Sequence, residues 1–73
     1  MKEYLIKELD KWQAGRNDSN WSKLGRIFSD RLNECKRSVS RMANADNDIS
    51  IKDKISFNKC HYFSEIRAIL DKY

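Results

Sequence analysis

Proline is absent from this sequence, and glycine occurs only at Gly15 and Gly25. Without proline, no helix has to break at a residue that lacks a backbone donor. Two isolated glycines cannot build the glycine-rich loops that cradle phosphates, so the sequence excludes nucleotide-binding motifs of that kind.

Cysteines and long apolar runs are also scarce. Cys35 and Cys60 are too few for a disulfide framework and lack the close pairing of zinc or redox motifs, so we expect buried free thiols. No stretch approaches the roughly 20 apolar residues that span a bilayer, and the N-terminus lacks the apolar segment of a secretory signal. We therefore expect a cytoplasmic protein without a membrane partner.

The side chains that could carry chemistry are few. His61 is the only histidine, and on a helix its neighbour Cys60 points about 100° away, so the two do not form a dyad. Cys35 could reach His61 only after folding and has no local signature, and no spacing supports a zinc site made from these three residues. The sequence therefore predicts a protein that is not an enzyme and has no cofactor or metal.

The apolar pattern predicts an all-α fold. Leu5, Leu9 and Trp12 recur at i, i+4 and i+7, and Gly15 is placed to end this helix, which spans about residues 2–14. A third helix is expected over about residues 57–72, where apolar residues gather within an arc of roughly 120°. Its apolar residues are Tyr62, Phe63, Ile66, Ile69, Leu70 and Tyr73.

A long central helix is predicted over about residues 19–44. Gly25 interrupts its pattern, where glycine costs ~1 kcal/mol relative to alanine and would be explained by close packing against another element. Its apolar positions form one stripe: Trp21, Leu24, Phe28, Leu32, Cys35, Val39 and Met42.

We predict that the first and third helices pack on this stripe, giving one small three-helix domain over residues 1–73. The first helix, at about 1.5 Å per residue, covers only half of the stripe. If the third helix leaves part of it bare, the remainder becomes a homodimer surface on which two central helices pair antiparallel.

The stretch Ile49–Phe57 has two readings. Its apolar residues recur at spacings of two and four, which suits a short strand, but Ser50 and Asp53 resemble a helix-starting capping box. Because the chain has no partner strand elsewhere, we favour a short helical turn.

The net charge of +4 lies in the middle of the chain. The stretches before Arg16 and after Ala43 are each neutral, whereas the stretch between them has seven basic residues and three acids, and 7 − 3 = +4. At about 100° per residue, four of these basic residues fall within roughly 60° on the polar face of the central helix. They are Lys23, Arg26, Arg37 and Arg41.

This basic ridge is the predicted partner-binding site. Asp30 interrupts it, which counts against a surface that lies along nucleic-acid phosphates, because protein-facing surfaces more often mix signs. The plain alternative is the solvated face of an amphipathic helix. We predict a small regulatory or inhibitory protein that docks on a larger protein or nucleoprotein with an acidic surface. Direct nucleic-acid binding through the same face is the alternative.

Overall fold

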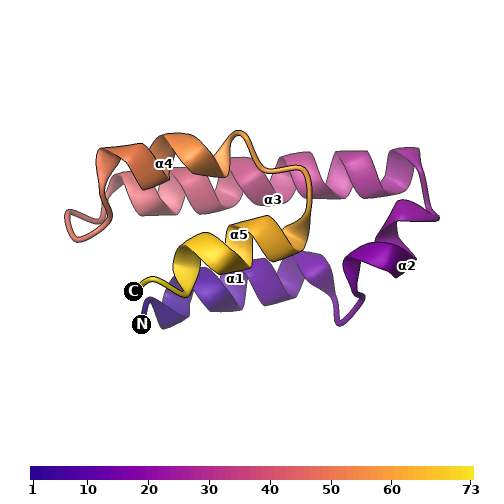
Figure 1. Cartoon of the computed structure of the whole chain (residues 1–73), viewed down its shortest axis with the longest axis horizontal. Helices are drawn as coiled ribbons and strands as arrows, with labels where there is room; N and C mark the ends of the chain where they lie inside the picture. Colours follow the sequence, from indigo (N-terminus) through magenta and orange to yellow (C-terminus); the bar gives the residue numbers. More distant parts are fainter.

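The computed structural model describes all 73 residues and contains five helices and no strand (Figure 1). The all-α class predicted from the sequence is confirmed, whereas the division into three helices is replaced by a division into five. The helices are α1 (Glu3–Gln13), α2 (Asp18–Ser22), α3 (Arg26–Asn44), α4 (Ile51–Phe57) and α5 (Phe63–Leu70).

The long helix α3 forms one side of the molecule, and α1 runs beside it in the opposite direction (Figure 1). Both α3 and α5 contact α1 and α4, so these four helices surround a common core, while α2 lies at one end. The two termini lie close together at the other end (Figure 1). No helix is long and apolar enough to cross a membrane.

The helix predicted over residues 19–44 is broken at Gly25. Here the backbone has φ 56° and ψ −115°, a conformation that residues with a Cβ atom rarely adopt. A Cβ atom added at Gly25 would meet nothing within 4 Å, so the glycine is needed for its backbone conformation and not for close packing. The prediction of a continuous helix is therefore wrong at residues 23–25, which separate α2 from α3.

The C-terminal end of α1 is held by side chains from later in the chain. Arg31 donates from Nε to the carbonyl of Trp12 at 2.5 Å and from Nη2 to that of Lys11 at 3.2 Å. The indole N–H of Trp21 donates to the carbonyl of Gln13 at 2.9 Å. The carbonyls that every helix leaves unpaired at its end are thus satisfied.

The only regular element between α3 and α5 is the helix α4, as the capping pattern of Ser50 and Asp53 favours. The Ser50 hydroxyl accepts from the Asp53 N–H at 3.1 Å and starts α4. The predicted helix over residues 57–72 is shorter, because α5 begins only at Phe63. There the Asp18 carboxylate accepts from the N–H groups of Phe63 and Ser64 at 3.0 and 3.3 Å.

The core contains four of the seven residues of the predicted stripe: Trp21, Leu32, Cys35 and Val39. The other three are partly buried against it, so the chain's own helices cover the stripe and the prediction of a homodimer through it finds no support. Cys35 and Cys60 are buried free thiols, as predicted.

Candidate binding surface on α3

Three of the four residues of the predicted basic ridge lie on the exposed face of α3. Arg26, Arg37 and Arg41 are exposed and fall within about 60° around the helix axis. From the first to the last, the helix rises by about 22 Å. Lys23 is also exposed, but it follows α2 on the other side of the Gly25 break, so helical spacing does not place it on the ridge.

The ridge carries both signs of charge. The Arg26 Nε lies 3.9 Å from the Asp30 carboxylate, and the Arg37 guanidinium lies 2.8 Å from that of Glu34. Arg41 has no acidic side chain within 4 Å. Exposed pairs of this kind contribute less than about 1 kcal/mol, so an arginine can exchange its helical partner for an incoming carboxylate at little cost.

Arg31, a fifth basic residue of the same helix, is structural. Its guanidinium carbon lies 5.6 Å from the Trp12 ring centroid and 5.5 Å from that of Trp21, and its N–H groups are bonded to α1 carbonyls. Stacking on two indoles and bonding to a helix C-terminus both favour the cation where it is. The Arg31 guanidinium therefore stabilises the fold and is not available to bind a partner.

The fold separates charges that cancel along the sequence. Residues 44–73 have no net charge, but their acids near α4 form ion pairs with lysines near the chain termini. Lys2 lies 3.1 Å from Asp46 and 2.8 Å from Asp48, and Lys72 lies 3.0 Å from Asp53. The Tyr4 hydroxyl and the Asp48 backbone N–H, both donating to Asp46, lower the pKa of that carboxyl to about 2. Asp46 is consequently ionised at neutral pH and paired with Lys2.

Two lysines have no acidic neighbour in this arrangement, one in α4 and one just after it. Lys52 and Lys59 are exposed, and no acidic side chain lies within 4 Å of either ammonium group. A hydrogen bond of 3.1 Å from Ser40 to Asn58 joins α3 to the end of α4. Exposed basic side chains thus lie at α4 as well as on α3, which a charge count along the sequence does not reveal.

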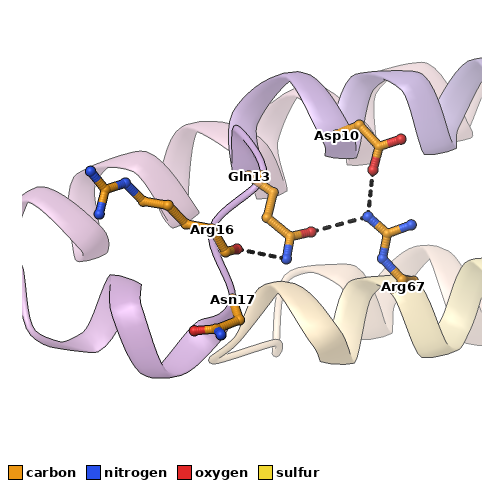
Figure 2. A pocket seen from close by; sticks show the side chains of 6 residues that line it. Asp10, Gln13, Arg16, Asn17 and Arg67 are labelled. Atoms are coloured by element: carbon orange, nitrogen blue, oxygen red, sulfur yellow. Dashed lines mark hydrogen bonds and ion pairs between the residues drawn. The ribbon is translucent and has the colours of Figure 1, made fainter.

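A polar hollow of about 360 Å³ lies where the end of α1 faces α5. Figure 2 shows Arg67 pointing toward Asp10 and Gln13, to which it donates hydrogen bonds. The Arg16 guanidinium points away from them (Figure 2) and lies 5.6 Å from the Trp21 ring centroid. Arg67 thus joins α5 to α1 across the hollow, whereas Arg16 has no acidic side chain within 4 Å and turns its charge away from this contact. The lining of the hollow is Asp10, Gln13, Gly15, Arg16, Asn17 and Arg67.

Of the groups considered for catalysis, the two thiols are buried and the histidine is exposed. Cys60 is buried while His61 is exposed, and no group of three or more histidine, cysteine or acidic side chains is placed to hold a metal ion. Burial raises the pKa of the Cys35 thiol to about 12 and also raises that of Cys60. Both thiols are therefore protonated at neutral pH.

Comparison of the chain with models of protein families, with curated protein sequences and with solved structures found no match. The function is accordingly argued from the geometry and charge of the molecule.

Proposed function

We propose that this protein is a small, non-enzymatic regulatory or inhibitory protein that docks on a larger protein or nucleoprotein through the exposed face of α3. The observation that carries the proposal is the mixture of exposed arginines and acids on that face: Arg26, Asp30, Glu34, Arg37 and Arg41.

The mixed signs favour a protein surface over nucleic-acid phosphates. A row of phosphates laid along α3 would gain from the arginines but would be repelled by Asp30 and Glu34. A partner with carboxylates opposite Arg37 and Arg41 and a basic or polar group opposite Glu34 gains at each position. Such complementarity also specifies the register of the two surfaces.

The inner side of α3 supports this role. Leu32, Cys35 and Val39 are almost completely buried, so the helix is held in place before any partner arrives. Binding then costs the ordering of a few side chains and not of a backbone segment, which favours affinity. Arginine adds a planar fork of donors that matches a carboxylate in two places.

The test uses the whole protein as bait with four variants, Arg37→Ala, Arg41→Ala, Lys23→Ala and Lys7→Ala. Lys7 is an exposed lysine of α1 without an acidic neighbour within 4 Å, so it is the matched control for removing a cation. We expect a partner that is retained by the wild type and by Lys7→Ala but lost with either arginine variant. Lys23→Ala should have a smaller effect than Arg37→Ala, because Lys23 lies off the helix.

Labelled duplex and single-stranded nucleic acids, titrated at two salt concentrations, test the alternative. Binding that collapses with salt, and whose log–log salt slope falls by about one unit on Arg37→Ala, would establish direct phosphate contact in place of a protein partner. Partner retention that is indifferent to both Arg37→Ala and Arg41→Ala would overturn the proposed use of α3.

A further inference from the structure

The outward face of α4 exposes two isoleucines one helical turn apart. The exposed fraction is 76% for Ile51 and 52% for Ile55. Neither holds α4 in place, because the buried side of this helix consists of Asp53 and Phe57. Branched aliphatic side chains at such exposure are covered favourably by any apolar surface that fits them.

A groove of about 330 Å³ lies between α4 and α5, and one of its lining residues is Ser56, which follows Ile55 in the sequence. At about 100° per residue along α4, Lys52 lies between Ile55 and Ser56, so the exposed face of α4 borders the groove at Ser56. Half of its six lining residues are apolar. The lining consists of Ser56, Lys59, Cys60, Glu65, Ala68 and Ile69.

Basic side chains surround this apolar surface. Lys52 of α4 and Lys59, two residues after the end of α4, are exposed and have no acidic side chain within 4 Å. Burial is the main cause that raises the pKa of Cys60. Glu65 of α5 raises this pKa further and Lys36 of α3 lowers it, so both charged groups lie close to Cys60. Three cations and one carboxylate give 3 − 1 = +2, and that carboxylate already accepts from the His61 N–H at 2.9 Å.

We propose that the α4 face and the adjoining groove bind an acidic amphipathic helix of a partner protein. One apolar side chain of that helix covers Ile51 and Ile55, and another, one or two turns along, enters the groove. Carboxylates that flank its apolar side meet Lys52 and Lys59. This is a second surface, separate from the α3 face.

Charge and shape favour this occupant over three others. A second copy joined through a two-fold axis would place the same lysines against each other in a chain of net charge +4. Nucleic-acid phosphates would contact the lysines but leave the isoleucines without an apolar partner. A flat lipid surface could cover the isoleucines but would leave the concave groove unfilled.

The probe is a fluorescein-labelled helical peptide of about four turns, with leucines spaced by three and four residues and glutamates on both flanks of the leucine face. Two matched peptides replace the glutamates with lysines or the leucines with serines. Fluorescence anisotropy with the full chain should give an affinity for the acidic peptide at least about tenfold above that for either matched peptide.

Variants then locate the contact. Ile51→Ser combined with Ile55→Ser should weaken binding of the acidic peptide by at least about tenfold, and Lys59→Glu by a similar factor. The matched controls are Ile27→Ser, an isoleucine of α3 that is 61% exposed, and Lys7→Glu on α1, and neither should change the affinity by more than about twofold. All these side chains are exposed, so circular dichroism should show a helix content equal to that of the wild type.

Several outcomes would overturn the proposal. They are equal affinity for all three peptides, an effect of Ile27→Ser as large as that of the α4 variants, and binding of phosphatidylserine vesicles or duplex DNA with the same dependence on α4. A wild-type dimer in sedimentation that Ile55→Ser dissociates would identify the occupant as a second copy. Arg37→Ala should leave peptide binding unchanged, so failure here and failure of the α3 proposal remain distinguishable.

Discussion

Replacing Arg31 with alanine should destabilise the protein far more than replacing any arginine of the exposed α3 face. Arg31 donates to two carbonyls at the end of α1 and lies between the rings of Trp12 and Trp21. Its removal leaves two helix carbonyls without a protein donor and takes the cation off both indoles. Arg26, by contrast, has a side chain that is 93% exposed and only a long ion pair to Asp30.

The magnitude follows from these contacts. A hydrogen bond from a charged donor contributes about 1.5–3 kcal/mol, and the half-buried position of Arg31 favours the lower end of that range. Each cation–π contact adds about 0.5–1 kcal/mol. Because the contacts share one side chain they are not additive, and we expect Arg31→Ala to lower the free energy of unfolding by about 2–4 kcal/mol. The total free energy of unfolding of a small domain is only about 5–15 kcal/mol, so the expected loss is a large fraction of the stability.

Urea denaturation followed by circular dichroism measures the effect, and thermal unfolding should show a fall in Tm of at least about 8 °C. Arg26→Ala is the control and should change the unfolding free energy by less than about 0.5 kcal/mol. Arg31→Lys should recover only part of the loss, since an ammonium group lacks the planar fork of donors. Equal destabilisation by Arg31→Ala and Arg26→Ala would refute the structural role given to Arg31.

Three further predictions follow from single sites. Gly25→Ala should lower the unfolding free energy by about 1–3 kcal/mol because of the positive φ, whereas Gly15→Asn, at φ 74°, should be tolerated better; thermal melts compare the two. Asp46, whose pKa is lowered to about 2, stabilises the fold above the unfolded value near 4 and loses that contribution as the pH falls toward 2; Tyr4→Phe should raise its pKa toward 3.8 in an NMR titration. Cys35, buried and with a pKa raised to about 12, should react with a thiol reagent at pH 8 only after denaturation, and rapid labelling of the native protein would contradict its burial.

The parts of the fold that sequence patterns predicted are those fixed by local chemistry. The spacing of Leu5, Leu9 and Trp12 predicted α1 to within a residue at each end, and Ser50 indicated the start of α4. Both signals act within about two helical turns, where apolar periodicity and capping groups determine the outcome.

The errors arose where a distant side chain determines the local structure. The apolar pattern runs through residues 57–72 without a break, but the Asp18 carboxylate, 45 residues earlier, fixes the first N–H groups of α5. At Gly25 the apolar pattern is equally unbroken, and close packing against another element is the wrong explanation for a glycine at this position. Read as the residue best able to leave helical geometry, Gly25 was the one local signal that could have indicated the break.

The charge distribution shows why the candidate surfaces could be predicted only in part. A count along the chain assigns the whole net charge to residues 16–43 and treats every basic residue there as equivalent. In the folded protein Arg31 is withdrawn into contacts with α1, while Lys52 and Lys59 are exposed without acidic neighbours because Lys2 and Lys72 engage Asp46, Asp48 and Asp53. Electrostatic attraction depends on distance in space, and pairs formed between the chain termini and α4 join residues 19 to 46 positions apart. The arginines of α3 could be identified because helical spacing alone places them together. The basic character of the α4 surface, by contrast, arises only when lysines near the two chain termini pair with the acids near α4.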